Sequence, residues 1–343
     1  MIQFLTYIKK YELIFEMNFK NLFFFMLFIS NTISISINSS YKKCRFVSNS
    51  VKIECSNWDG KCIDTLIFKG GGSRAIVYAG AIKKLEQENM LNEVKYLAGS
   101  SSGAQTAALI CCGYSSNELE NALRCAPWES ILDSGFFNIK GIFNLISKYG
   151  FYDSKNLQEY LESLIYIKTG KKEITFKELY DMSNIHLKVG VCSLTDKKFK
   201  YIDYQSYPNM PISVGLTASS SIPFIFTTTK WEEELFVDGG LIGNLPITAF
   251  PDNNCLAFNL LDMSDKQMLN ENPKNILDFG KVIFKILYLY AQEMIRLKNK
   301  NLDNIEFIEI FTNKVNLLDV NIKNETIVNL INYGYDAVET FLR

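Results

Sequence analysis

Short apolar runs alternate with amphipathic stretches from about residue 60 to the C-terminus. The apolar runs predict buried strands at 63–68, 94–99, 186–194, 199–204, 234–238, 255–261 and 305–311. Apolar residues at helical spacing predict helices after Ala75 and Gly103, and over 276–297 and 326–342. Strands that alternate with helices indicate the α/β class, and 63–99 has the pattern of a right-handed βαβ unit.

Capping patterns place the starts of three further helices. Ser115 with Glu118, and Thr175 with Glu178, have the spacing of a capping box, in which each side chain bonds the other residue's backbone amide. Asp153 stands before an apolar repeat at helical spacing, so we expect it to cap a helix. The stretch 128–152 between these helices is rich in aromatic residues. It predicts either ordinary core or an apolar mouth for acyl chains.

The N-terminal residues 1–60 have a different pattern. Leu22 to Ile29 is an unbroken apolar run, which fades into a Ser/Asn/Ile mixture and is too short for a confident membrane span of about 20 residues. About twenty residues precede it, but a start at Met17 would give the layout of a secretory signal. We therefore expect 1–60 to be a targeting or membrane-associating segment, either a signal peptide or anchor or an apolar helix packed on the protein or a membrane surface. Residues 61–343 would form the globular domain, and a cytoplasmic location remains the alternative.

Composition limits the possible partners. The 343 residues are 48% apolar and carry a formal charge of −1, which gives no electrostatic basis for nucleic-acid binding. Eight cysteines form no C-x-x-C pair and have no histidine partner at metal spacing. We therefore expect no metal and no cofactor.

The strand predicted at 94–99 leads into the pentapeptide Gly99-Ser100-Ser101-Ser102-Gly103. In G-x-S-x-G the two glycines let a strand reverse sharply into a helix, which exposes the central hydroxyl. The helix N-terminus behind the turn favours negative charge developing there. By itself the pentapeptide is a moderate signal, because a Ser/Gly-rich loop has the same composition. Its strand–turn–helix setting makes Ser101 a candidate nucleophile.

Two more strand ends carry candidate chemistry. Gly70, Gly71 and Gly72 follow the strand at 63–68, so their backbone N–H groups can converge on an anion. The nucleotide spacing G-x-G-x-x-G is missing. Asp238 ends another apolar strand before Gly239-Gly240. That stretch alone would also suit a hairpin turn.

The single histidine narrows the chemistry. A Ser–His–Asp triad needs an imidazole, and in α/β-hydrolases it follows the acid in the chain. His186 precedes Asp238 and begins an apolar strand, so we interpret it as structural. A hydrolase on this chain would then use a carboxylate as the base, which requires a direct, dry contact between Ser101 and Asp238. Without an imidazole base of pKa about 6.5, we expect turnover to persist to about pH 6.

Together these motifs resemble the patatin-like phospholipases. The glycine loop 69–74, the serine pentapeptide 99–103 and Asp238-Gly239-Gly240 occur in that family's order and approximate spacing, and 218–226 resembles its Ala-Ser-x-x-x-Pro segment. The resemblance covers roughly Asp64 to the C-terminus. It implies a three-layer α/β/α sandwich with a mostly parallel central sheet, no metal, and hydrolysis of acyl esters in phospholipids or other lipids at a membrane surface.

Carried over by position, the resemblance makes Ser101 the nucleophile and Asp238 its base. It makes the backbone of Gly70, Gly71 and Gly72 the oxyanion hole, with Arg74 holding that loop. Lys69 and Ala75 depart from the family's usual residues without touching the chemistry.

Two other function classes stay open. The chain could be an acyltransferase that passes the acyl group to an alcohol or thiol instead of water. It could also be a lipid-binding protein without turnover, although Ser101 and Asp238 are both present.

Overall fold

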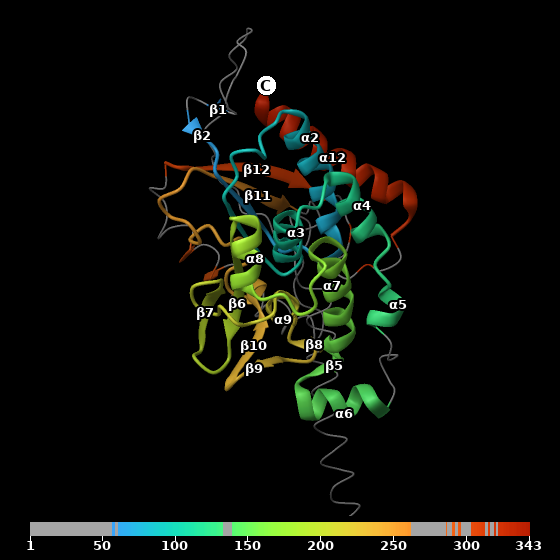
Figure 1. The fold of residues 1–343 in the computed structure, drawn as a ribbon. Helices are drawn as coiled ribbons and strands as arrows, with labels where there is room; N and C mark the ends of the chain where they lie inside the picture. The colour runs from blue at the N-terminus through green and yellow to red at the C-terminus, as the bar shows by residue number, and fades with distance from the viewer. Residues whose placement is uncertain are drawn as a thin grey trace, which may run out of the picture.

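A central sheet with helices packed against it forms the body of the protein (Figure 1). The computed structural model describes residues 57–58, 61–132, 139–261, 286, 290–291, 294–295, 303–312, 315, 319 and 322–343. Within these residues the sheet has eight strands. Along its hydrogen-bonded path they are β12 (Ile305–Phe311), β11 (Cys255–Leu261), β3 (Thr65–Phe68), β4 (Tyr96–Ser100), β6 (His186–Ser193), β10 (Glu234–Asp238) and β9 (Thr229–Trp231), and β7 (Lys198–Ile202) also pairs with β6.

The strands from β12 to β6 are parallel, whereas β7, β10 and β9 pair antiparallel. The expected α/β class with a mostly parallel sheet is therefore confirmed. The connection from β3 through α2 (Val77–Gln87) to β4 joins parallel neighbours, as the βαβ pattern predicted. In a parallel sheet the carboxyl ends of the strands share one side, where the connecting loops can carry chemistry.

Strands β4 and β10 meet end to end along one edge of β6. Strand β4 pairs with residues 186–190 of β6, and β10 pairs antiparallel with residues 191–193. Strand β7 pairs with residues 189–193 and so occupies the opposite edge. Because β4 and β10 run toward each other, their last residues Ser100 and Asp238 face the adjacent β6 residues Gly190 and Val191. This register brings two distant segments together.

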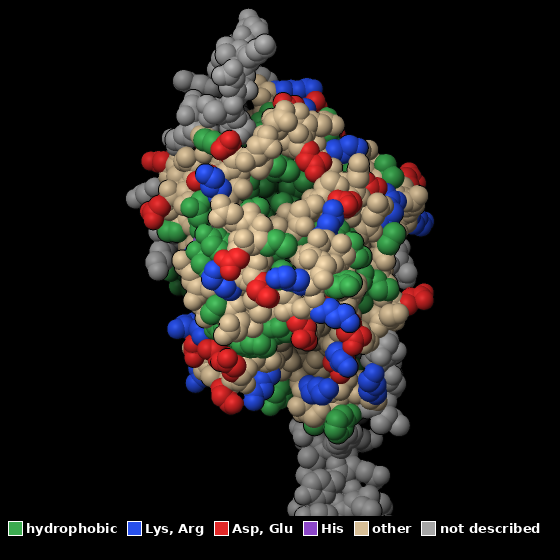
Figure 2. Space-filling model, in the orientation of Figure 1, with side chains coloured by type: hydrophobic (Ala, Val, Ile, Leu, Met, Phe, Trp, Pro, Cys, Tyr) green, Lys and Arg blue, Asp and Glu red, His purple; other side chains and the backbone are tan. Residues whose placement is uncertain are grey.

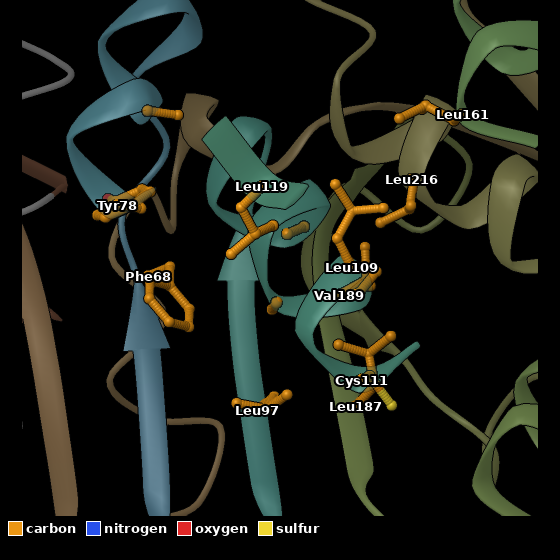
Figure 3. Close-up of a cluster of buried hydrophobic side chains, with 14 of the residues drawn as sticks. Phe68, Tyr78, Leu97, Leu109, Cys111, Leu119, Leu161, Leu187, Val189 and Leu216 are labelled. Atoms are coloured by element: carbon orange, nitrogen blue, oxygen red, sulfur yellow. The ribbon is translucent and has the colours of Figure 1, made fainter. Parts of the chain in front are cut away.

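Alternate strand residues face two separate cores. Leu66 and Phe68 of β3, with Leu97 of β4, point into the larger cluster, whereas Ile67 and Ala98 point into the smaller one. The larger core includes side chains from α3 (Ser102–Cys111), α4 (Ser116–Arg124), α7 (Ser154–Thr169) and α9 (Ile212–Ser219) (Figure 3). The smaller core is covered by segment 245–250 and by Ile295, one of the helical residues between 286 and 295. Helical cover on both faces gives the three layers expected.

Helix α12 (Asn324–Leu342) packs on α2 with the two backbones in contact. A Cβ at Gly80 would lie 1.8 Å from the Ile331 carbonyl oxygen, and one at Gly334 would lie 1.8 Å from that of Val77. Only glycine permits this approach. The C-terminal helix is thereby held against the helix that follows the glycine loop.

The remaining described elements are smaller or peripheral. They are β1 (Asn57–Trp58), β2 (Lys61–Cys62), η1 (Gly72–Ile76), α5 (Trp128–Ile131), α6 (Ile139–Lys148), β5 (Gly150–Tyr152), α8 (Phe176–Ser183), β8 (Phe224–Phe226) and η2 (Gly239–Leu241). Strands β5 and β8 form a separate parallel pair, and α6 lies at the lower end of the molecule in Figure 1.

The helix starts predicted from capping patterns are confirmed. Ser115 with Glu118, and Thr175 with Glu178, form capping boxes, and the Asp153 carboxylate accepts a hydrogen bond from the Lys155 amide. The strand predicted at 63–68 is shorter and begins at Thr65.

Two sequence-based predictions fall mainly outside the described residues. Most of the helix predicted at 276–297 lies there, as does all of 1–60 except 57–58. In the part of the chain that is described, no helix combines the length and the apolar character needed to cross a membrane.

Candidate active site

The turn between β4 and α3 places Ser101 in a strained backbone conformation. Its φ of 53° and ψ of −131° lie outside the regions that non-glycine residues ordinarily occupy. Such strain costs about 1–3 kcal/mol and clusters at functional sites. The flanking glycines make the turn possible, because a Cβ at Gly99 would lie 2.3 Å from the Gly103 carbonyl carbon. A Cβ at Gly103 would lie 2.4 Å from the Phe68 carbonyl oxygen.

The Ser101 side chain meets the carboxylate of Asp238. Its hydroxyl Oγ donates a hydrogen bond of 2.7 Å to Asp238 Oδ2, and the Gly240 amide donates one of 2.6 Å to Asp238 Oδ1. Ser101 is 9% exposed and Asp238 is 6% exposed. Two residues 137 positions apart thus form the direct, dry contact that a Ser–Asp mechanism requires.

Burial changes the acidity of this carboxyl group. Loss of solvation raises the pKa of Asp238 from its ordinary value to about 7, although the hydrogen bonds from Ser101 and Gly240 act in the opposite direction. A carboxylate of pKa near 7 is a much better proton acceptor at neutral pH than one of pKa about 4. The sequence-based expectation of turnover down to about pH 6 considered only the absence of an imidazole base, whereas a carboxyl pKa of about 7 predicts a fall below about pH 7.

The glycine loop lies against Ser102 and Asn244. Gly70 is held in both directions, since its amide donates to the Asn244 carbonyl at 3.0 Å and Asn244 Nδ2 donates to the Gly70 carbonyl at 3.2 Å. The Gly71 amide donates to Ser102 Oγ at 2.9 Å. Gly72 has a φ of 54°, and no recorded hydrogen bond joins its amide to another described residue.

Two charged side chains anchor the ends of this loop. Arg74 is buried, and its Nε donates to the carbonyl of Val315 at 2.7 Å. Lys69 Nζ donates to Asn259 Oδ1 and to the Leu260 carbonyl, both at 2.9 Å, which joins the loop to the end of β11. These contacts tie both ends of the loop to neighbouring segments, and the role of Arg74 in holding the loop stays a prediction.

Segment 218–222 contacts both members of the Ser101–Asp238 pair. Ser219 Oγ accepts a hydrogen bond of 2.8 Å from the Ser101 amide and donates one of 2.6 Å to the Gly190 carbonyl. The carbonyl of Ser221 accepts one of 3.0 Å from the Asp238 amide. The segment thus fixes the backbones of both residues in register.

Ser219 and Asn244 are two site residues that are not predicted from the sequence. Ser219 is the serine of the Ala-Ser-x-x-x-Pro pattern that supports the family resemblance, but that pattern does not indicate which groups its hydroxyl contacts. Asn244 accepts the Gly70 amide through its backbone carbonyl, and because every residue has such a carbonyl, the residue type does not predict this contact.

The only histidine lies away from this site. His186 begins β6, four residues before Gly190, which is about 13 Å along a strand. Its Nε2 lies 3.0 Å from Asp203 Oδ2, and its ring packs against Tyr204 and Phe250. These contacts agree with a structural role for His186.

No group of three or more His, Cys, Asp or Glu side chains arranged to hold a metal ion is present among the residues with described positions. The expectation of a reaction without metal or cofactor stays a prediction.

Comparison with known proteins identifies the family. The family model "Patatin-like phospholipase" matches residues 66–251, which include the glycine loop, Ser101 and Asp238. The chain belongs to the patatin-like phospholipase family.

Similar proteins come from viruses and bacteria. The chain is 28% identical over 193 residues to uncharacterized protein R571 of Acanthamoeba polyphaga mimivirus, and 28% identical over 189 residues to probable lipid hydrolase 463L of invertebrate iridescent virus 6. These matches cover 56% and 54% of this chain and 62% and 63% of the viral proteins. The crystal structure of VipD from Legionella pneumophila has the same fold, with a TM-score of 0.55 at 16% identity over 82% of this chain and 67% of VipD.

Proposed function

We propose that this protein is a serine lipid acyl hydrolase of the phospholipase A or lysophospholipase type, with Ser101 as nucleophile and Asp238 as base. The observation that carries the proposal is the buried hydrogen bond of 2.7 Å between the two side chains. Membership of the patatin-like phospholipase family and the similarity to a probable viral lipid hydrolase support a lipid ester as substrate.

The reaction would proceed in two steps. Asp238 takes the Ser101 proton as Oγ attacks the ester carbonyl carbon, and the protonated carboxyl then gives that proton to the departing alcohol oxygen. In the second step Asp238 accepts a proton from water as the water oxygen attacks the acyl carbonyl carbon. The bond to Ser101 Oγ then breaks, the fatty acid leaves, and Asp238 returns the proton to Oγ. Asp238 needs no partner acid, because it is regenerated in each half of the cycle.

The developing oxyanion would be stabilised by backbone amides of the glycine loop. In this conformation the Gly70 amide already donates to Asn244, so we assign Gly70 to loop architecture and the donor role to Gly71 and Gly72. The Gly71 amide would exchange Ser102 Oγ for the oxyanion, which is the stronger acceptor because it is charged. Arg74 would act through the loop rather than on the substrate.

Residues 61–343 would form the catalytic domain, and residues 1–60 would direct the protein to membranes. The substrate, a phospholipid or other lipid ester, resides in such a surface. We propose no nucleic-acid partner.

Serine variants test the assignment of the nucleophile. Ser101→Ala should abolish hydrolysis of a fluorescent phospholipid and labelling by a fluorophosphonate probe. Ser100→Ala is the matched control, since the Ser100 hydroxyl donates to the Gly243 carbonyl and not to a carboxylate. An active Ser101→Ala protein would refute the mechanism. Analysis of products separates a hydrolase, which releases fatty acid, from an acyltransferase, which forms a new ester.

A further inference from the structure

Helix α6 has apolar residues on both of its faces. Leu145 is buried in the larger core at 5% exposure, and Ile142 packs against that core. On the opposite face Phe143 is 66% exposed and Ile146 is 54% exposed, and Tyr149 directly after the helix is 57% exposed. A surface helix normally has polar residues on its outer face. Within the described part of the aromatic-rich stretch 128–152, some residues are therefore core and others face outward, and the apolar mouth stays a prediction.

The charges on this helix favour a negatively charged partner. Residues 139–148 contain Lys140 and Lys148 and no Asp or Glu. Lys148 Nζ lies 3.2 Å from Asp153 Oδ2, and its side chain is still 49% exposed. In Figure 2, hydrophobic surface at the lower end of the molecule lies beside Lys and Arg side chains. Exposed aromatic and aliphatic residues next to lysines are the pattern of helices that lie in a membrane interface.

The end of α6 is connected to the candidate active site by a short path of hydrogen bonds. The Phe224 amide donates to the Tyr149 carbonyl at 3.2 Å, where β8 begins its pairing with β5. Ser221 lies three residues before Phe224, and its carbonyl accepts the Asp238 amide. Three extended residues span at most about 11 Å. The Tyr149 carbonyl therefore lies within roughly 17 Å of the amide of Asp238, which belongs to the pair of residues that we propose to act on lipids.

We propose that Phe143, Ile146 and Tyr149 form a docking face that inserts into the surface of an anionic lipid bilayer. The inference rests on the proposed function, because it names the surface from which a lipid ester would reach Ser101. The apolar side chains enter the boundary between headgroups and acyl chains, and Lys140 and Lys148 contact anionic headgroups.

The test compares vesicle binding with turnover of a soluble substrate. The chain of residues 1–343 is mixed with vesicles of phosphatidylcholine alone, or with phosphatidylglycerol added, and the bound fraction is measured by flotation. The double variant Phe143→Ser/Ile146→Ser should bind roughly 100-fold more weakly, at about tenfold per apolar side chain removed. It should lose hydrolysis of vesicle lipid in proportion. Hydrolysis of a monomeric ester should be unchanged, because neither side chain contacts the site.

Two further variants keep the result specific. Met182→Ser on α8 removes an apolar side chain of similar exposure, at 50%, and should leave binding unchanged. Lys140→Glu should weaken binding several-fold only to vesicles that contain phosphatidylglycerol, at about 1 kcal/mol per lysine. If the double variant also loses hydrolysis of the monomeric ester, Lys140→Glu becomes the test of the docking face. Weaker binding to vesicles with phosphatidylglycerol would then support the proposal, and unchanged binding would refute it.

Other outcomes would overturn the proposal. If the double variant binds vesicles as well as the wild type does, the docking face is refuted. This result does not depend on whether the wild type hydrolyses any ester, so it tests the docking face separately from the proposed function. A dimer of the wild type that dissociates in the double variant, with vesicle binding intact, would assign the face to a second copy of the chain.

Discussion

Two buried aspartates at opposite ends of β6 show how the surroundings decide what a carboxyl group can do. Asp203 lies beside His186 at the start of the strand, and Asp238 lies opposite Val191 near its end. Burial acts to raise both pKa values. For Asp203 the hydrogen bonds from His186 and Ser206 outweigh it and hold the pKa at about 2. For Asp238 the hydrogen bonds from the Ser101 hydroxyl and the Gly240 amide are too weak to offset burial, and the pKa is about 7.

The difference in pKa supports our proposal that Asp238, and not Asp203, acts as the base. A carboxylate held at low pKa by an imidazole, a hydroxyl and backbone amides is a poor proton acceptor, because those partners stabilise its charge. Asp238 has only neutral partners, so its charge is costly and a proton is readily accepted. Asp238, which we propose as the base, lies where the carboxyl end of β4 meets that of β10, whereas Asp203 lies beside the first residue of β6.

The largest expected effect comes from removing each carboxylate in turn. Asp238→Asn should lower turnover of a lipid ester by roughly 10³–10⁴-fold, in line with losses of other dyad or triad members. Asp203→Asn should leave turnover within a few-fold of the wild type in folded protein. Steady-state kinetics on a monomeric ester, with folding checked by circular dichroism, measures both. Equal losses in the two variants would remove the distinction between the two aspartates.

A smaller loss is expected when the support of Ser101 is weakened. Ser219→Ala removes the hydroxyl that bridges the Ser101 amide and the Gly190 carbonyl, so the strained turn between β4 and α3 loses one of its restraints. Turnover should fall about 10- to 100-fold, mainly in kcat, because a small misplacement of a nucleophile is costly. Ser220→Ala is the matched control, since its hydroxyl accepts from Gln105. A loss no larger than that of the control would show that Ser219 does not position Ser101.

The pH dependence of turnover tests the raised pKa directly. Only ionised Asp238 can accept the Ser101 proton, so kcat/KM should fall below about pH 7, by about tenfold per pH unit. An imidazole base would give a similar dependence of kcat/KM on pH. The same pH profile is therefore measured for Asp203→Asn and His186→Gln, which should keep it if Asp238 is the base. A rate that stays level down to about pH 5 would mean that Asp238 has an ordinary carboxyl pKa.

The raised pKa of Asp238 predicts that stability falls as pH rises, whereas activity increases as pH rises. Because the folded pKa of Asp238 is above the unfolded value of about 3.9, the folded state binds more protons between about pH 4 and 7, and stability falls over that range as pH rises. The ionised carboxylate costs on the order of 4 kcal/mol above about pH 7. Asp238→Asn should therefore raise Tm by roughly 5 °C at about pH 8 and change it little at about pH 4. Thermal melts at the two pH values measure this, and a lower Tm at about pH 8 would contradict it.

Sequence reasoning reached the fold class and the candidate residues because local patterns encode them. The glycines around Ser101 are needed for one close approach of backbone, and the apolar run of β10 ends at Asp238, so both positions can be found without a structure. The meeting of β4 and β10 on one edge of β6 is a matter of long-range register, which no local pattern contains. The same holds for the Asn244 contact with Gly70 and for the raised pKa, because burial depends on the whole fold.

The smallest expected effect is that of His186→Gln on turnover. His186 is the only imidazole in the chain, so any serine–histidine mechanism would have to use it. It begins β6, four residues before the residue that faces Ser100, and its Nε2 contacts Asp203 instead. Glutamine keeps an N–H donor for Asp203, so we expect a loss of stability of about 1–3 kcal/mol and turnover within a few-fold of the wild type. Kinetics on a monomeric ester below the melting temperature of the variant measures this. If folded His186→Gln protein were as inactive as Ser101→Ala, the imidazole would be the base, and the contrast between the two aspartates would have no bearing on catalysis.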